Sequence, residues 1–435
     1  MKKMILTLIS LLLICSACIS NPVENPVNGP QTGDDGDLQN GKVDYDPNPE
    51  YSPEELDGLV LGHNQFALAL YKLLAKRDKN LVYSPYSLYQ ALTMLYAGAA
   101  GETASQFEQA LALSAKNPDI HRLMNALNLD LVQKNENMEE SEQAVLEIAN
   151  ALWVQKDAEL LQSYLDTISE NYASGLRSLD FANAQKAADL INQWAAEATN
   201  EKITEIARPD MFSADTQLAL TNAVYFKGTW AQQFEESGTR NEDFMLLDGT
   251  VISVPTMITS GTFPVRVNEH YQMIEMPYKG SNIAMDLIMP LDGDWDHFEE
   301  MSAENLQSYL TDMVYHLVYQ DVILSMPKFK IETPEIDLIN PMKSLGLVDI
   351  FGPDANLAGM DGREDLYVST LVQKAYIDVN ENGSEAAAAT LGVVEAKSAP
   401  SNEEPIEMHF DHPFLFVIRD TKTGTILFIG QLMQP

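Results

Sequence analysis

Residues 374–413, KAYIDVNENGSEAAAATLGVVEAKSAPSNEEPIEMHFDHP, decide how the rest of the chain can be understood. Ala375, Ile377 and Val379 recur at every second position, and this two-residue period is typical of a β-strand. Beyond Asn382-Gly383 the residues are small or polar, and no apolar stripe remains that could be buried. We therefore expect a strand that runs into an exposed loop of roughly 25 residues, which is too long to be a mere connection.

A helix is the alternative for the middle of this segment. Ser384 could cap a helix, and the alanine run 386–389 has the highest helix propensity of any residue type. Local propensity alone does not separate the two interpretations.

Motifs along the chain resemble those of the serpin family. E-x-G-S-E-A-A-A-A-T at 381–390 resembles the hinge of inhibitory serpins, and M-H-F-D-H-P-F-L-F-V-I at 408–418 resembles their carboxy-terminal signature. Residues 80–103 resemble the amino-terminal core motif, and LALTNAVYFKGTW at 218–230 resembles a central strand. The resemblance implies a mixed α+β fold with three β-sheets, about nine helices and a reactive-centre loop at one pole.

The hinge that this resemblance implies is the segment that enters the large sheet after a protease cuts the loop. Its residues are Glu381, Gly383, Ser384, Glu385, Ala386, Ala387, Ala388, Ala389 and Thr390. Side chains of a strand alternate between faces, so we expect Ser384 and the even-numbered residues up to Val394 to face inward. The one charge of the alanine-rich part, at Glu385, then faces solvent.

The resemblance also implies a cleaved bond and a polar cluster beneath the sheet. The family's usual spacing, sixteen residues on from Glu381, gives Lys397-Ser398, and Lys397 would suit a trypsin-like serine protease. The loop is a few residues longer than in many serpins, so Ala396 or Val394, which suit an elastase-like protease, stay alternatives. The polar cluster, called the shutter, is implied to consist of Ser84, Ser87, Asn222 and Gln373, with Gln373 where the family usually has histidine. Trp230 is implied to lie at the breach, the top of the sheet where insertion begins.

The amino terminus has the features of an exported protein. Residues 1–17 combine a basic start with a short apolar run, which predicts a signal peptide of the lipoprotein type with lipidation at Cys18. Cleavage nearby and ordinary secretion is the alternative. Residues 18–57 are rich in proline, glycine and acidic residues and predict a flexible linker, so the folded body is expected at 58–435. The expected location is the cell envelope.

Composition limits the partners and the chemistry. The 435-residue chain carries a formal charge of −37, which argues against nucleic acid and heparin-like polyanions and favours basic proteins, although solubility alone could explain the charge. Cys15 and Cys18 are the only cysteines, so the body has no disulfide and no thiol nucleophile. The sequence has no metalloprotease, nucleophile-elbow or nucleotide-binding motif. We expect a monomer that is not an enzyme and uses no metal or cofactor.

Two functions from different classes remain. The first is a suicide inhibitor that traps a serine protease as a covalent acyl-enzyme while its loop inserts into the large sheet. The second is a non-inhibitory binding or carrier lipoprotein with the same fold. The small residues of the hinge favour the first.

One prediction concerns local structure. Thr103-x-x-Gln106 matches the pattern of a helix capping box, so we expect a helix to begin at Thr103.

Overall fold

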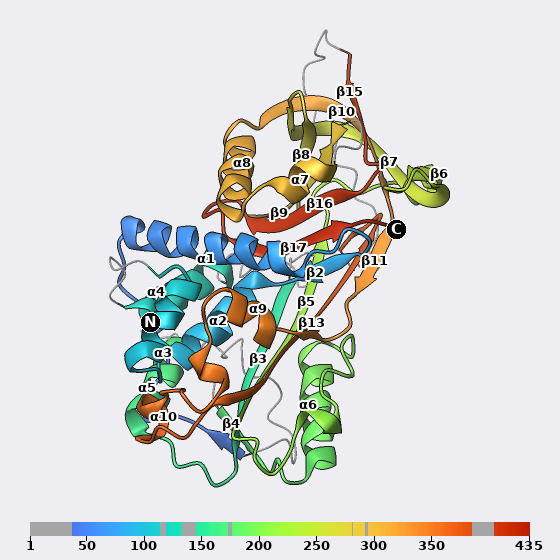
Figure 1. Cartoon of the computed structure of the whole chain (residues 1–435). Coiled ribbons are helices and arrows are strands. Elements are labelled where there is room, and N and C mark those ends of the chain that lie inside the picture. The colour runs from blue at the N-terminus through green and yellow to red at the C-terminus, as the bar shows by residue number, and fades with distance from the viewer. Residues whose placement is uncertain are drawn as a thin grey trace, which may run out of the picture.

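The computed structural model describes residues 37–113, 119–132, 145–172, 176–280, 282–291, 295–384 and 404–435. These residues form two hydrogen-bonded β-sheets and ten α-helices, which confirms the expected α+β class (Figure 1). None of the described helices is both long enough and apolar enough to cross a membrane.

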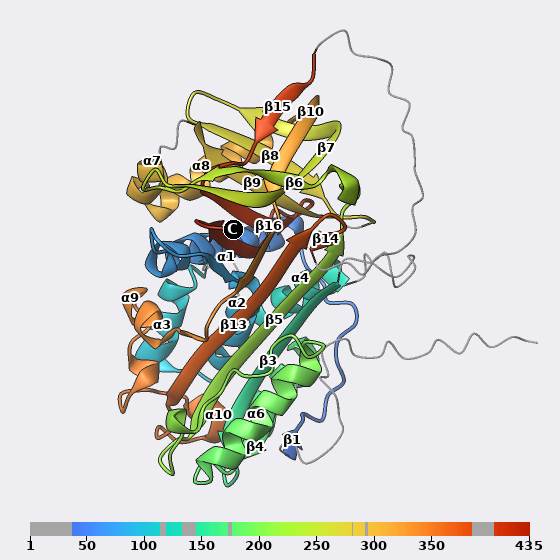
Figure 2. The same ribbon diagram turned by 90° about the vertical axis from the view of Figure 1, so that its right-hand side faces the viewer.

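An eight-stranded sheet runs through the lower body. In spatial order its strands are β1 (Asp37–Gln39), β4 (Leu176–Leu179), β3 (Val145–Gln155), β5 (Leu218–Thr229), β14 (Gly383–Ser384), β13 (Val368–Asn380) and β11 (Phe329–Glu332), with β12 (Ile336–Asp337) beside β13. Figure 2 shows β3, β5 and β13 side by side as its long central strands.

The central strands are buried on both faces. Helix α6 (Ala184–Ala198) covers the outer face, where its Trp194 packs on Trp153 in a buried cluster that also holds Tyr225 and Tyr376, while α2 (Pro85–Tyr96) lies under the inner face (Figure 2). Because neither face meets water, nine consecutive residues of β5 are buried instead of alternating between buried and exposed positions.

The second sheet has nine described strands. In order they are β15 (Ile406–His409), β10 (Val318–Pro327), β7 (Val251–Val267), β8 (Tyr271–Pro277), β9 (Ile283–Pro290), β16 (Phe414–Asp420), β17 (Ile426–Leu432) and β2 (Leu81–Tyr83), with β6 (Arg240–Met245) beside β7. The 17-residue β7 pairs with β6, β10 and β8 in turn. It therefore joins the strands of the expected second and third sheets into one hydrogen-bonded network.

Helices fill the remaining surface, and the described residues hold one more than the nine expected. Besides α2 and α6 they are α1 (Pro53–Leu74), α3 (Gly101–Ala110), α4 (Ile120–Val132), α5 (Gln162–Tyr172), α7 (Trp295–Glu300), α8 (Ala303–Tyr315), α9 (Ile339–Ser344) and α10 (Ala358–Asp361). Helix α1 crosses the molecule beside the nine-stranded sheet (Figure 1).

The amino-terminal segment corrects the expected linker boundary at residue 57. Residues 37–52, here called the strap, pack on the body: β1 pairs antiparallel with the edge strand β4, and the amide of Asp46 donates to the carbonyl of Glu170 in α5. Asn125 Nδ2 of α4 donates to the Asp46 carbonyl at 2.8 Å. Helix α1 then starts at Pro53, with Ser52 and Glu55 forming a capping box. The folded part therefore includes about the last half of the predicted linker, residues 37–57.

The predicted capping box at Thr103 and Gln106 is wrong. Helix α3 already begins at Gly101, so both side chains lie inside it. Thr103 Oγ1 accepts from the amide of Asn356 at 2.9 Å, and Gln106 Oε1 accepts from the amide of Val348 at 2.8 Å. Because a distant backbone uses these oxygens, they fix the segment between α9 and α10 to α3.

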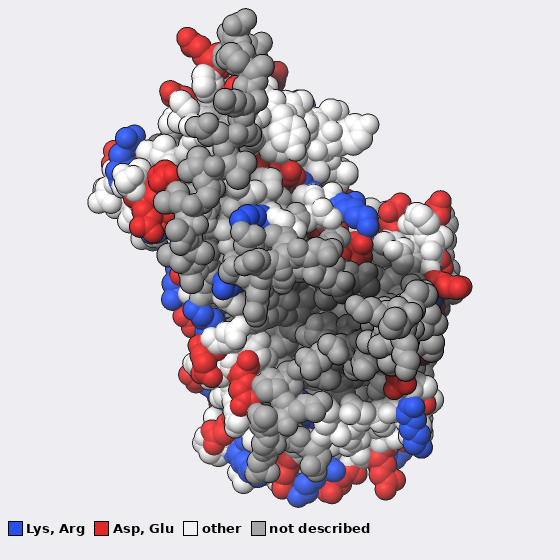
Figure 3. All heavy atoms as spheres, turned by 180° about the vertical axis from the view of Figure 1, so that it is seen from behind, with Lys and Arg blue, Asp and Glu red and all other residues white. Residues whose placement is uncertain are grey.

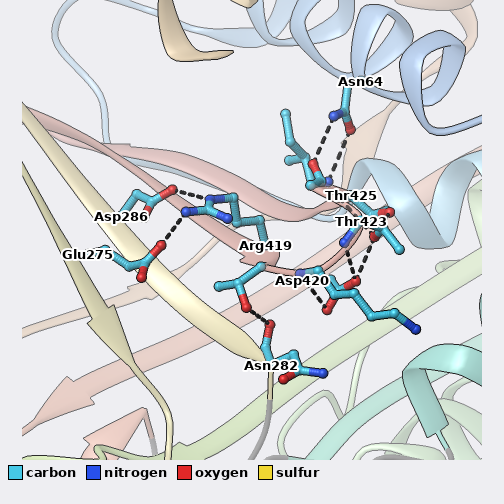
Figure 4. A network of polar contacts seen from close by, with 12 residues as sticks. Asn64, Glu275, Asn282, Asp286, Arg419, Asp420, Thr423 and Thr425 are labelled. Atoms are coloured by element: carbon cyan, nitrogen blue, oxygen red, sulfur yellow. Dashed lines mark hydrogen bonds and ion pairs between the residues drawn. The ribbon is translucent and has the colours of Figure 1, made fainter. Parts of the chain in front are cut away.

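Polar contacts fasten the carboxy-terminal hairpin of β16 and β17 (Figure 4). Arg419 Nε donates to Asp286 Oδ2 at 2.6 Å, and the same guanidinium pairs with Glu275. At the hairpin turn, Asn64 of α1 donates to the carbonyl of Gly424 at 2.8 Å. The buried ion pair holds β16 against β9 and β8.

Charges on the back face of the molecule are mixed. Figure 3 shows Lys and Arg side chains lying singly among Asp and Glu, with no broad basic patch among the residues coloured there.

Candidate functional site

The boundary between β5 and β13 is the candidate site. The two strands pair in parallel from Val368 opposite Leu218 to Tyr376 opposite Tyr225, and we call this paired stretch the seam. Past Tyr376 the strands separate, and β14 lies between them, antiparallel to both. The seam is thus closed along its length and open at one end, where the predicted hinge begins.

Glycine is required at the position where β14 lies between β5 and β13. Gly383 has φ +151°, and a Cβ atom there would lie 1.9 Å from the carbonyl oxygen of Gly228. A Cβ on Gly228 would in turn lie 2.6 Å from a ring carbon of Tyr278. Glycine at 383 therefore allows the backbones of β14 and β5 to approach closely, and glycine at 228 leaves room for the Tyr278 ring.

Ser384 is already buried in the sheet. It pairs with Val379 and Gly228, and its Oγ lies 2.6 Å from the hydroxyl oxygen of Tyr278. Ser384 faces inward, as expected, but it occupies this position before any cleavage. Insertion would therefore bury the residues that follow Ser384, not Ser384 itself.

Trp230 holds the open end of the seam. Its ring stacks on Tyr278 with centroids 4.5 Å apart, and its Nε1 donates to the carbonyl of Asn380 at 3.0 Å. The Trp230 amide donates to the carbonyl of Asn382, also at 3.0 Å. Trp230 thus binds both sides of the turn that leads from β13 into β14.

Glu381 anchors the same turn through its side chain. One carboxylate oxygen lies 2.8 Å from Lys328 Nζ, and the other accepts from Thr239 Oγ1 at 2.6 Å. Burial alone would raise the pKa of the Glu381 carboxyl, but the bonds from Lys328 and Thr239 outweigh it and hold this pKa below its ordinary value. The ionised carboxylate therefore keeps the base of the loop in place.

The predicted shutter residues meet beneath the middle of the seam. Gln373 Oε1 accepts from the amide of Ser84 at 3.0 Å, and Gln373 Nε2 donates to the carbonyl of Ser84 at 2.9 Å and to Asn222 Oδ1. Asn222 Nδ2 donates to Ser87 Oγ. All four residues are fully buried. The Gln373–Asn222 bond links β13 to β5, so it must break before a strand can pass between them.

Sequence reasoning missed two members of this cluster. Asn150 of β3 accepts from Ser87 Oγ at 3.2 Å and donates to Gln90 Oε1 at 2.9 Å. Asn150 also lies opposite Asn222 in the sheet register. A polar residue within the otherwise apolar stretch ANALWV was the available signal.

Several predicted site residues lie outside the described part of the chain. They are the hinge residues Glu385 to Thr390, the bond Lys397-Ser398 and the lipidation residue Cys18. In the part that the structure describes, no group of three or more His, Cys, Asp or Glu side chains is arranged to hold a metal ion.

Comparison with known proteins gives this architecture its family. The family profile described as serpin (serine protease inhibitor) matches residues 61–435. The chain belongs to the serpin family. An uncharacterized serpin-like protein of Thermococcus kodakarensis is 35% identical over 444 residues, covering 100% of this chain and 99% of that protein. The leukocyte elastase inhibitor of Bos taurus is 32% identical over 391 residues, covering 87% of this chain and 100% of that protein.

Solved serpin structures share the fold. The crystal structure of Serpin48, described as a highly specific serpin of the insect Tenebrio molitor, matches with a TM-score of 0.76 at 28% identity, covering 89% of this chain and 100% of that one. Serpins are generally inhibitors of proteases and not catalytic enzymes.

Proposed function

We propose that this serpin is a suicide inhibitor of serine proteases that traps its target by inserting its loop into the seam between β5 and β13. The observation that carries the proposal is β14, a two-residue strand that already pairs with both sides of the open end. A protease would attack the loop as a substrate and form an acyl-enzyme with it. Cleavage would then free the loop to extend β14 as a new central strand.

The register of β14 supports this path. Ser384 lies opposite Val379 and Gly228. If β14 were extended, each added residue would lie opposite the preceding residue of β13 and of β5, because the pairing is antiparallel to both. Six residues on, Thr390 would come between Gln373 and Asn222. Those two residues already face each other across the seam. Both edges would therefore accept the new strand without a change of register.

The side chains of the hinge fit the two faces of the sheet. Even-numbered residues share the parity of Ser384, so Ala386, Ala388 and Thr390 would face the core. The shutter side chains leave little room on the inner face of the sheet, and all three of these residues are small enough to fit there. Glu385 would lie on the outer face between Asp378 and Lys227, where Lys227 offers an opposite charge.

The length of the seam supports Lys397-Ser398 as the cleaved bond. Ten residues on from Ser384, Val394 would reach Leu218, where β5 begins. Lys397 would lie three residues beyond, outside the sheet at its far end, where a bound protease has room. Cleavage after Val394 would press an elastase-like protease against the end of β5. Ala396 remains the elastase-like alternative, and a lysine favours a trypsin-like target.

A denaturing gel tests the function. The purified protein is mixed with trypsin and, separately, with an elastase. We expect a band at the summed mass of inhibitor and trypsin, and a released fragment whose first residue is Ser398. Replacement Lys397→Ala should lower the rate of trypsin inhibition by at least tenfold. Complete cleavage with no such band would instead indicate a non-inhibitory serpin with a carrier or binding role.

We further propose that the protein is a lipoprotein of the cell envelope. The support is the sequence alone, in which Cys18 follows small residues after a short apolar run. Replacement Cys18→Ser should move the protein from the membrane fraction to the soluble fraction. Wild-type protein found only in the soluble fraction would favour ordinary secretion.

A further inference from the structure

We propose that Tyr225 and Tyr376, here called the aromatic rung, form a latch that sets the rate at which the loop enters the sheet. The inference rests on the proposed insertion mechanism and names residues that control it. The rung lies at the open end of the seam, on the face opposite the shutter. It would therefore be the first contact across the seam that an entering strand has to break on the outer face.

The position of the rung follows from the register. Tyr376 opposite Tyr225 is the last pair of residues that joins β13 to β5 before the strands separate. Ser384 lies three residues above this level on both edges. Ala387, three residues on from Ser384, would come between the two tyrosines. A small residue is thus the one that has to pass between two large ones.

Contacts of the rung cross the seam. The two ring centroids lie 6.5 Å apart at an interplanar angle of 48°, and both side chains are at least 95% buried. Lys202, in the segment after α6, places its Nζ 5.9 Å from the centroid of Tyr376. Two residues before Tyr376 in β13, Lys374 donates from its Nζ to the carbonyl of Glu205 in the same segment at 3.2 Å. These contacts fasten β13 to β5 and to the segment that follows α6.

Other contacts of Tyr376 do not cross the seam. Lys330 of β11 places its Nζ 4.8 Å from the centroid of Tyr376, and the Tyr376 hydroxyl donates to Asp378 Oδ2 at 3.4 Å. Both partners lie on the β13 side, so they would hold the ring in place while the seam opens. Tyr376 is therefore fixed on its own side and bonded across the gap by the aromatic pair and Lys202.

Opening the seam removes only the crossing contacts. A new strand adds one strand spacing of about 4.8 Å between β5 and β13. The two rings would then lie more than 10 Å apart, beyond the range of an aromatic pair. Since the pair and the cation above it exist only while the seam is closed, they raise the barrier to entry.

Uptake of a synthetic peptide tests the latch without any protease. The peptide EAAAATLGVVEA, which corresponds to residues 385–396, is incubated with intact protein, and uptake is followed by the rise in melting temperature. We expect Tyr376→Val to take up the peptide roughly fivefold to tenfold faster than wild type, and Tyr225→Leu, on the other edge, to do the same. Tyr376→Phe keeps the ring and should stay close to wild type.

The control removes aromatic packing from the same buried cluster at a residue outside β5 and β13. Phe212 stacks on Phe181 with centroids 5.4 Å apart, and neither residue lies on β5 or β13. Phe212→Leu should lower stability without a comparable gain in uptake rate. Equal rates in wild type, Tyr376→Val and Tyr225→Leu would overturn the latch, as would equal acceleration by Phe212→Leu or no uptake by any of them. A protein that takes up the peptide as expected but traps neither trypsin nor the elastase would refute the proposed function and leave the latch standing.

Discussion

The hydroxyl oxygen of Tyr278 lies 2.6 Å from Ser384 Oγ, so the hinge residue Ser384 is bonded inside the sheet while the seam is closed. Tyr278 in turn stacks on Trp230, which binds the backbone on both sides of the Asn380–Asn382 turn. In the proposed mechanism, β14 is therefore the already aligned start of the strand that enters the seam. What remains is to open the seam below it.

The two residues after Ser384 would face opposite sides of the sheet, so substitutions there test whether burial of the side chain decides the outcome. Ala386 would lie between Ile377 and Phe226, both fully buried, whereas Glu385 would lie on the outer face. Ala386→Arg would bury an unpaired charge at a cost of at least several kcal/mol, which should slow insertion and turn the inhibitor into a substrate. Glu385→Arg should be much milder. The measurement is the stoichiometry of inhibition against one protease, and similar values for the two variants would contradict the inserted-strand geometry.

The shutter offers a test of its chemistry. Gln373 bonds both the amide and the carbonyl of Ser84, and a glutamine has no titration near neutral pH. Gln373→His would place a titratable ring in this buried site. Peptide uptake by the variant should then change severalfold between pH 5.5 and 8, beyond any change in wild type. Parallel pH profiles for the two proteins would mean that this position does not govern opening.

The sequence predicted the parts of the site that alternation and motifs can reveal. The two-residue period over Ala375–Val379 correctly indicated a strand, and the four shutter residues were named together although they are far apart in the chain. Register could not be predicted, because it depends on which strand lies beside which. The early burial of Ser384 follows from that pairing and has no local signal.

Local patterns also failed where distant backbone competes for a side chain. Thr103 and Gln106 fit a capping box, but their oxygens bond the amides of Asn356 and Val348. Proline and acidic residues made 18–57 look unfolded, although backbone pairing with β4 needs no apolar side chains. Such contacts depend on tertiary structure and leave no periodicity to detect.

The strap should stabilise the edge of the large sheet. A Cβ atom on Gly41 would lie 2.6 Å from the carbonyl oxygen of Leu165 in α5, so Gly41→Val should detach the strap. We expect a melting temperature lower by a few degrees and faster hydrogen exchange at residues 37–39. Gly238→Val is the matched control, because a Cβ there meets no atom closer than 3.6 Å. Unchanged exchange in Gly41→Val would show that the strap is not held by this contact.

Buried histidines predict acid lability. Burial lowers the pKa of His63 to about 4 and that of His121 to about 4, from an ordinary value of 6.5. Between pH 6.5 and 4 the unfolded chain therefore binds more protons at these residues, and stability falls as the pH falls. Burial raises the pKa of Asp286 to about 6 despite Arg419, which acts in the opposite direction between pH 6 and 4. The effect of the two histidines exceeds that of the one carboxyl, so we expect the free energy of unfolding to fall as the pH is lowered.

Denaturant unfolding measures this balance. Replacement His63→Gln should reduce the slope of unfolding free energy between pH 4 and 6 by about 1.4 kcal/mol per pH unit. His316→Gln, at a half-exposed position, is the control. An unchanged slope in His63→Gln would mean that His63 binds its proton equally in the folded and unfolded chain.

The melting temperature of the loop-cleaved protein tests the central claim most directly. Cutting the loop with a protease that is not trapped frees the hinge to enter the seam without adding a bound protease to the protein. If the seam accepts the loop as a strand, its hydrogen bonds and apolar contacts should raise the melting temperature by roughly 10 °C or more above that of intact protein. Equal melting temperatures for the intact and the cleaved protein would contradict insertion and the inhibitory mechanism built on it.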